Sequence, residues 1–531
     1  MENGSEDGFL ERAYSRIRQA ASVSATSPAR ILPRPEAISA ARASLPDPND
    51  PDYLKGRGGE ATLDHVLQTL APAFNGQNLS GRYWGFVTGS TLPIAEMADN
   101  VVSAYDQNVH VHLPEQSIST EVEDAALSML LRLLHLGGPS AWEGRTFTTG
   151  ATASNILGLA CGREAVLSAR LPPGSESVGE LGLLRACALA HVEEIQVLTS
   201  MGHSSISKAA SIVGLGRASV KDLPYSDEEP WRLDLDAVEG ELRRGRVANI
   251  ISVSAGEVNT GRFATAGFEE MKRLRELADR YGAWIHVDGG SFCDIAMTVR
   301  QVANVTLLAF GFFARILPEI SEFARLRSMT TGLELADSIT LDGHKSLNVP
   351  YDSGVFFTRK ASSLTSVCKN PNAAYLSGGA SCEIQNPSNV GLENSRRFRA
   401  LPVYAALVSE GRDGLAAMVA RMVRLARAIA RVVRDSEHYA LLAGGDHGEE
   451  EIELEDVSVV VLFRAKDDDL NEVLVDRIQR TGEWYASGTK WKGQTACRIA
   501  VASWRADVEE DARLVERGLA AIAAEHFASA G

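Results

Sequence analysis

The chain has 531 residues, of which 45% are hydrophobic, and its mean hydropathy is -0.08. We expect a chain of this length and composition to fold into two or three domains around a large buried core. Its 53 lysines and arginines are outnumbered by 69 aspartates and glutamates, for a net charge of -16. Such a charge repels nucleic acid and anionic membranes unless a basic patch intervenes, and the sequence has no such patch. We therefore expect neither as a partner.

Cysteine usage and the amino terminus indicate a cytoplasmic protein. The six cysteines are widely spaced and form no CxxC pair or metal-ligand motif, which favours reduced thiols and no metal site. The amino terminus is mixed and acidic, without the apolar core of a signal peptide. The most apolar run, "VANVTLLAFGFFARIL", is short for a membrane span.

The first 95 residues are expected to form an arm and helices. Residues 1 to about 55 are rich in Ala, Ser, Pro and charge and end in "LPDPNDPDYLKGRGGE", where repeated prolines predict an extended arm rather than long helices. Apolar spacing predicts a helix over "ATLDHVLQTLAPAF" and a stronger one over "STEVEDAALSMLLRLLHLGG".

A large α/β domain is expected over residues 96–395 and a small α+β domain over 396–531. Between residues 146 and 357, helical segments alternate with short β-branched runs: "EIQVLTS", "ANIISVSAG", "AWIHVDGG", "DSITLDG" and "SGVFFTR". This alternation is typical of a mostly parallel sheet covered by helices. The last domain begins with the long helix "GLAAMVARMVRLARAIARVVRD", followed by the strands "VSVVVLFRA" and "TACRIAVASW" and by further helices.

The first candidate for chemistry is "TFTTGATASNILGLACGREA", in which a Gly/Thr/Ser loop opens a helix. Free amides and the helix dipole at such a junction bind a phosphate without a cation. An ordinary capped helix is an equally good interpretation of this segment alone. It is neither a Walker loop nor a GxGxxG motif.

Three further candidates follow predicted strands. His203 can stack on an aromatic ligand or move a proton, although a capping or core histidine is commoner. Asp288 ends a buried strand, where a carboxylate is costly unless it meets a cation and where ligands bind in open α/β sheets. Lys345 lies between two strand-like runs in "SITLDGHKSLNVPYDSGVFF". A phosphate site, a stacking residue, an acid and a lysine, in this order, are what a pyridoxal phosphate site requires.

Over residues 60–520 the chain resembles the group II pyridoxal-phosphate-dependent amino acid decarboxylases, the family of aromatic amino acid, tyrosine, histidine and glutamate decarboxylases. The resemblance lies in "YWGFVTG", "GATASN", "HSSISKAA", "SAGEVNTG", "WIHVDG", "DGHKSLNVPYDSG", "NSRRFRALPVYAAL" and "CRIAVASW". It implies a fold-type I enzyme with pyridoxal 5′-phosphate as cofactor. It also implies decarboxylation of an L-amino acid to its amine, and a homodimer whose active site forms at the interface.

The resemblance also assigns roles around the cofactor. Lys345 is implied as the lysine that bonds the cofactor, Asp288 as the partner of the pyridine nitrogen and His203 as the residue stacked on the ring. Three residues are implied as neighbours of the phosphate: His344, Ala151 and Thr152. Ser254 is implied beside the ring.

Two more residues are implied on the substrate side. Arg498 matches an arginine that binds the substrate α-carboxylate in some members. Tyr375, in the loop-like segment "NPNAAYLSGGA", matches a tyrosine that protonates the product carbon from a mobile loop. Members with phenylalanine there tend toward oxidative aldehyde formation.

The chain departs from the family pattern in ways that leave the substrate open. Ser346 stands where tryptophan is usual, and Ala151 where a second glycine is common. In the implied substrate segment, Val109 and Val111 stand where aromatic-specific members carry larger side chains. Two alternatives to a decarboxylase therefore stay open: an aldehyde synthase or other lyase with the same cofactor, and a scaffold without activity.

An interruption follows the expected acid. In the family "HVDG" runs directly into "AFG", whereas here the 19 residues Gly290–Leu308 lie between them. Insertions are tolerated in surface loops rather than at the end of a central strand. We interpret the segment as a retained intron in a eukaryotic gene model; the alternative is a genuine insertion, which would place the role of Asp288 in doubt.

Overall fold

The computed structural model describes residues 6–22, 31–202, 204–289, 310–370, 384–442 and 453–530. Its largest element is a seven-stranded sheet of order β1-β7-β6-β5-β4-β2-β3. The strands are β1 Gly144–Thr148, β2 Glu194–Thr199, β3 Val220–Asp222, β4 Val247–Ser254, β5 Trp284–Gly289, β6 Ser338–Asp342 and β7 Gly354–Thr358. Strands β3, β2, β4, β5 and β6 are parallel, and β7 is antiparallel to both of its neighbours. The mostly parallel sheet expected from the sequence is confirmed.

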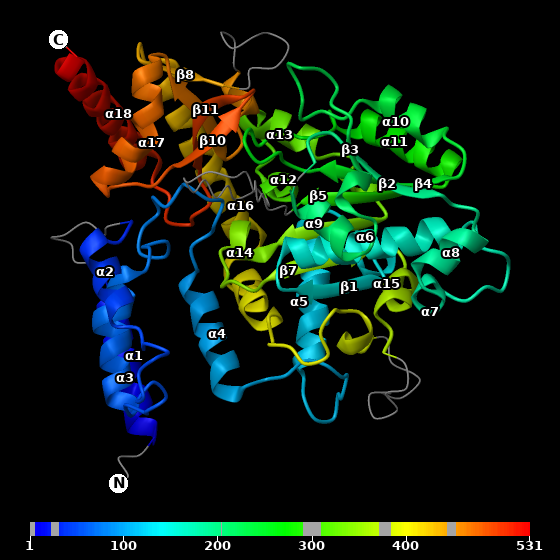
Figure 1. Cartoon of the computed structure of the whole chain (residues 1–531), viewed down its shortest axis with the longest axis horizontal. Coiled ribbons are helices and arrows are strands. Elements are labelled where there is room, and N and C mark those ends of the chain that lie inside the picture. The colour runs from blue at the N-terminus through cyan, green and yellow to red at the C-terminus, as the bar shows by residue number, and fades with distance from the viewer. Residues whose placement is uncertain are drawn as a thin grey trace.

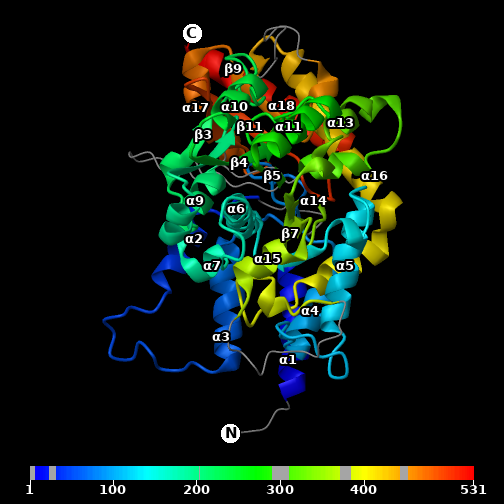
Figure 2. The ribbon, with the colours of Figure 1, turned by 90° about the vertical axis from the view of Figure 1, so that its right-hand side faces the viewer.

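Helices cover both faces of this sheet (Figures 1 and 2). The helices on and around the sheet are α4 Pro93–Tyr105, α5 Ser119–Leu133, α6 Ala151–Ser168, α7 Val178–Leu181, α8 Leu183–Leu189, α9 Ser204–Ile212, α10 Leu235–Leu242, α11 Phe268–Tyr281, α12 Phe310–Phe313, α13 Ala324–Met329, α14 Gly343–Ser346 and α15 Ala361–Cys368. Helices α10 and α11 lie on one face, and α6 and α15 on the other.

Alternating side chains of the central strands feed two hydrophobic cores. Ile285 and Val287 of β5 point into the core shared with α10 and α11, whereas Trp284 belongs to the core beside α6. Strand β4 divides in the same way, with Ile251 on the first side and Ile250 on the second. A strand buried on both faces explains why these segments read as continuous apolar runs.

The carboxy-terminal part forms a separate layer, at the upper left of Figure 1. Its sheet is antiparallel with the order β10-β11-β9-β8, and its strands are β8 Tyr439–Leu441, β9 Val460–Ala465, β10 Ser487–Trp491 and β11 Gln494–Ala500. Its helices are α16 Ala400–Arg434, α17 Asp468–Thr481 and α18 Val508–Ala530. Helix α16 is kinked at Gly411, whose φ of 60° lies in the left-handed region that glycine adopts readily.

The amino-terminal segment corrects one expectation. Instead of an extended arm it contains α1 Glu6–Ala21 and α2 Pro35–Ala43, followed by α3 Gly59–His65. They lie at the edge of the molecule (Figure 1), where α1 and α3 are joined by the ion pairs Arg12–Glu60 and Arg16–Asp64. Proline does not prevent them because no proline falls inside α1, and Pro35 occupies the first turn of α2, where a missing N–H costs nothing. Within the described ranges, no helix is both long enough and apolar enough to cross a membrane.

Candidate active site

Three of the expected site residues meet where β5 and β6 end. Asp288 lies near the carboxyl end of β5, and Lys345 lies in α14, which follows β6 directly. The two strands are parallel neighbours with Asp288 opposite Thr340. On the other side of β5, Ser254 of β4 is in register with Asp288. Ligands of open α/β sheets bind at this edge.

Lys345 is buried and paired with a carboxylate. Its side chain is 1% exposed, and its Nζ lies 2.7 Å from Oδ2 of Asp342. The other carboxylate oxygen, Oδ1, accepts a hydrogen bond of 2.7 Å from the backbone N–H of Ala151. One acid therefore joins the lysine to the amino terminus of α6.

The loop-to-helix junction expected from the sequence is present at the amino terminus of α6. Gly150 is its N-cap and supplies no side-chain cap. The amide of Ala151 already donates to Asp342, so an anion at this turn would meet the amides that follow it. Ala151 and Thr152 begin the helix. The strand β7 closes on this turn, because a Cβ on Gly354 would lie 2.5 Å from the Cα of Gly150. Only glycine fits there.

His344 borders the same junction. Its Cε1 would lie 3.4 Å from a Cβ on Gly150. The backbone N–H of Ser353 donates to its Nδ1 at 3.4 Å, and its Nε2 lies 3.8 Å from Oδ2 of Asp342. Because Nδ1 accepts, the ring proton is on Nε2, facing the acid. Burial lowers the pKa of His344, and the charge of Asp342 opposes this shift.

Asp288 is buried and held by an amide side chain of α6. It is 2% exposed, and Nδ2 of Asn155 donates to its Oδ2 at 3.0 Å. The same Nδ2 donates to Oγ of Ser205, at 2.9 Å, in the first turn of α9. Ser254, opposite on β4, donates its hydroxyl to the carbonyl of Gly256 at 3.2 Å.

Two predicted site residues, His203 and Tyr375, lie outside the described residues. Residues on either side of His203 are nevertheless anchored. The backbone N–H of Gly202 donates to Oδ1 of Asp222 at 2.8 Å, and Oγ of Ser205 accepts from Nδ2 of Asn155 at 2.9 Å. The start of α9 is thereby joined to the asparagine that holds Asp288.

Arg498 enters from the carboxy-terminal sheet and is fully buried. Its Nη2 donates to the carbonyl of Gly85 at 2.8 Å, and its Nη1 to the carbonyl of Val258 at 3.2 Å. The segment around Gly85 also reaches the lysine, because a Cβ on Gly89 would lie 2.3 Å from the carbonyl oxygen of Lys345. Arg498 and Lys345 thus border the same amino-terminal loop.

Asn348 joins the amino-terminal loop around Ser90 to the carboxy-terminal segment 502–504. This residue was not identified from the sequence. It is fully buried, and its Oδ1 accepts the backbone N–H groups of Ser90, at 3.1 Å, and of Trp504, at 2.8 Å. Its Nδ2 donates to the carbonyl of Ala502 at 3.0 Å. The signal that could have identified it is its position three residues after Lys345. Asp342, three residues before the lysine, could have been found in the same way.

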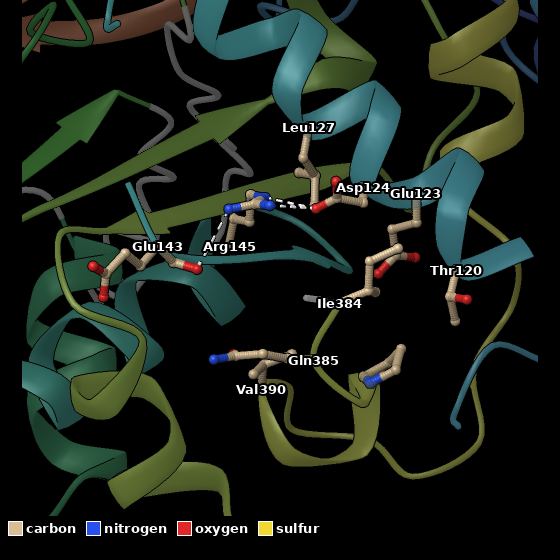
Figure 3. A pocket seen from close by; sticks show the side chains of 10 residues that line it. Thr120, Glu123, Asp124, Leu127, Glu143, Arg145, Ile384, Gln385 and Val390 are labelled. Carbon is tan, nitrogen blue, oxygen red and sulfur yellow. Dashed lines mark hydrogen bonds and ion pairs between the residues drawn. The ribbon is translucent and has the colours of Figure 1, made fainter. Parts of the chain in front are cut away.

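A small pocket elsewhere lies between α5, β1 and residues 384–390 (Figure 3). Two of its acids meet arginines: Nε of Arg145 donates to Asp124 at 2.8 Å (Figure 3), and Nη1 of Arg396 donates to Glu123 at 2.8 Å. None of the predicted cofactor residues lines it. We assign it no ligand.

The residues at the strand ends fit pyridoxal 5′-phosphate. A buried amine suits the aldehyde, amides at the start of a helix suit the phosphate, and a buried carboxylate on the adjacent strand suits a protonated ring nitrogen. Because β7 meets the N-cap Gly150 through Gly354, this residue of β7 places no side chain at the start of α6. Fold and site together place the protein among the fold-type I pyridoxal phosphate enzymes.

Comparison with known proteins agrees. The family model "Pyridoxal-dependent decarboxylase conserved domain" matches residues 316–465. The L-2,4-diaminobutyrate decarboxylase of Acinetobacter baumannii is 24% identical, with 75% of this chain and 72% of that protein covered. The aromatic-L-amino-acid decarboxylase of Sus scrofa is also 24% identical, covering 90% and 87%. The structure of Oryza sativa TDC with PLP and tryptamine has a TM-score of 0.75 at 19% identity, covering 98% and 99%.

The chain thus matches the pyridoxal-dependent decarboxylases over residues 316–465 and is similar to group II amino acid decarboxylases over most of its length, as the sequence motifs indicated. Its cofactor is pyridoxal 5′-phosphate.

Proposed function

We propose that this pyridoxal-phosphate-dependent carboxy-lyase removes the α-carboxylate of an L-amino acid as carbon dioxide and releases the corresponding amine. The observation that carries the proposal is the position of Lys345. Its amine is buried beside the amino terminus of α6, and the adjacent strand ends in the buried acid Asp288.

The cofactor, when bound, supplies an aldehyde that combines with an amino group and a ring that accepts the electron pair of the breaking Cα–carboxylate bond. Lys345 would provide the amino group that holds the cofactor. Asp288 keeps a proton on the ring nitrogen through its negative charge. The first amides of α6 hold the phosphate, with Thr152 and His344 beside it.

On the substrate side, Arg498 orients the α-carboxylate and His203 lies against the ring face. Tyr375 delivers a proton to the α-carbon after carbon dioxide has left. A neutral phenol is a suitable donor because closure of the site excludes the water that would otherwise compete.

We also propose a cytoplasmic homodimer with the divisions 1–95, 96–395 and 396–531. Large apolar side chains on α1 and α4 support the dimer, since Tyr14, Met97 and Tyr105 are between 42% and 73% exposed. An exposed apolar surface of this kind is typical of an interface between copies. Light scattering of the purified protein measures its mass, and a monomer at all concentrations would contradict the dimer.

A screen of the common L-amino acids for carbon dioxide release tests the function. The expected result is release from one or a few substrates, together with a stoichiometric amine. Aldehyde and peroxide in place of amine would show an aldehyde synthase. If the protein binds the cofactor but forms no product from any amino acid, it is a scaffold without activity.

A further inference from the structure

A chain of buried polar groups runs behind Asp288 along one face of β5. In "WIHVDG" alternate residues share a face, so Trp284, His286 and Asp288 all point toward α6. Nε1 of Trp284 donates to Oγ of Ser338 on β6 at 3.0 Å, and that Oγ lies 2.8 Å from Nδ1 of His286. Nε2 of His286 lies 2.9 Å from Oδ1 of Asn155. Asn155 then donates to Asp288.

The acid at one end and the indole at the other fix the directions of the bonds in this chain. An ionised carboxylate can only accept, so Asn155 turns its NH₂ group toward Asp288 and its carbonyl oxygen toward His286. That carbonyl oxygen also only accepts, so the ring proton of His286 is on Nε2 and Nδ1 is an acceptor. The hydroxyl of Ser338 therefore donates to Nδ1, and its oxygen accepts from the indole N–H of Trp284.

Two glycines of α6 make room for this arrangement. A Cβ on Gly158 would lie 2.3 Å from Cε1 of His286, and one on Gly162 would lie 3.0 Å from Cδ1 of Trp284. They are one helical turn apart, so they face the same strand. The helix therefore approaches β5 closely enough for Asn155 to bridge the histidine and the acid.

His286 is fully buried, and desolvation lowers its pKa to about 3. It is therefore neutral at physiological pH, as a group that both accepts and donates within the chain must be. The ring of Phe356 lies 6.5 Å away, centroid to centroid, and adds no charge. Asp288 is the charged group that the chain reaches.

We propose that Asn155 and His286 are positioning residues that hold Asp288 ionised and aimed at the ring nitrogen, and that Ser338, oriented by Trp284, donates to Nδ1 of His286 and so favours the tautomer whose Nε2–H faces Asn155. The effect on the reaction rests on the proposed function, whereas the direction of the hydrogen bonds does not. If Asn155 turned over, its carbonyl oxygen would face a carboxylate and both acceptors would lack a proton. The acid would then be less stable in its charged form.

The hydrogen-bond direction is tested on the cofactor-free protein. Magic-angle-spinning ¹⁵N NMR of histidine-labelled protein distinguishes the two ring tautomers, and His286→Gln identifies the signal. The expected signal is a neutral ring with the proton on Nε2, and in Ser338→Ala we expect a mixture of both tautomers. A proton on Nδ1, a charged ring, or an unchanged signal in Ser338→Ala would overturn the proposal.

The consequence is tested on the loaded enzyme. Asn155→Leu, which removes the donor at similar volume, should lower kcat roughly 10- to 100-fold, the effect of losing a hydrogen bond to a charged group. The KM should change little, and the absorbance of the bound cofactor should titrate at a different pH. Ser219→Ala is the matched control for Ser338→Ala, since it removes a buried hydroxyl that donates only to the carbonyl of Gly216.

The two proposals fail separately. If the wild-type protein takes up no cofactor while His286 carries its proton on Nε2, the proposed function is wrong and the hydrogen-bond direction stands. If Asn155→Leu binds cofactor with an unchanged spectrum and an unchanged kcat, the positioning role is wrong and the function stands.

Discussion

One carboxylate, that of Asp342, joins the amine of Lys345 to the first amide of α6. Its Oδ2 lies 2.7 Å from the amine of Lys345, and its Oδ1 accepts the N–H of Ala151 at the start of α6. Asp342 therefore occupies the first amide of α6 with a negative charge, at the place where a phosphate would approach.

Replacing Asp342 with Asn should therefore speed covalent uptake of the cofactor by the empty enzyme roughly tenfold, the order expected from weakening a charged hydrogen bond. Stopped-flow absorbance after mixing with pyridoxal 5′-phosphate measures the rate. Asp234→Asn is the matched control, because it changes an N-cap of α10 and asparagine caps equally well. Slower uptake in Asp342→Asn alone would show that the acid assists loading.

Burial of His286 makes stability depend on pH. Its pKa is about 3 in the folded protein and about 6.5 in an unfolded chain. Between these values only the unfolded chain binds the proton, so the contribution to the free energy of unfolding is constant above pH 6.5 and falls as the pH drops toward 3. At pH 5 the loss is about 2 kcal/mol.

Denaturant unfolding of the wild type and of His286→Gln at pH 7.5 and pH 5 measures this contribution. The variant lacks the titrating group, so its stability deficit should shrink by about 2 kcal/mol at the lower pH. An equal deficit at both pH values would mean that His286 titrates alike in the folded and unfolded states.

The sequence supported the arrangement of Asp288 and Lys345 because a parallel sheet brings the ends of its strands together whatever the side chains are. The sequence did not predict the residues that support Asp288 from behind, Asn155 and His286. Asn155 meets His286 only because α6 crosses β5 at two glycines, and this crossing depends on packing rather than on any local pattern. The amino-terminal helices were missed because the prolines lie after α1, yet they were used to predict that the whole segment is extended.

Removing Gly290–Leu308 should leave the fold intact. A Cβ on Gly289 would lie 2.7 Å from the ring of Phe312, and one on Gly311 would lie 1.7 Å from the carbonyl oxygen of Ala255. The strand end and α12 therefore already pack together on both sides of the interruption. We expect the shortened protein to keep its unfolding midpoint and to bind cofactor at least as tightly.

Sequencing the mature transcript provides the independent check. A message without the 19 codons agrees with a retained intron, whereas a message that encodes them would show a genuine insertion. If the shortened protein cannot fold while the full chain can, the segment is part of the structure.

Tyr375→Phe should redirect the reaction. The substitution removes only the phenolic proton, so amine production should fall while oxygen uptake, peroxide and aldehyde appear with the same substrate. An oxygen electrode and product chromatography measure both outcomes. Tyr225→Phe, at an exposed tyrosine that lies over Arg232, should change neither. Wild-type amine yield without oxygen uptake in Tyr375→Phe would place the donor elsewhere, with His203 the next candidate.

The covalent attachment of the cofactor to Lys345 is the central claim, and peptide mapping after borohydride reduction tests it most directly. The wild-type protein, loaded with pyridoxal 5′-phosphate and reduced, should carry one modified lysine per chain in the peptide containing Lys345. Lys345→Ala should carry none and should lose decarboxylation, because the substitution removes the buried amine that would bond the cofactor. Modification at a different lysine, or full activity in Lys345→Ala, would contradict the account.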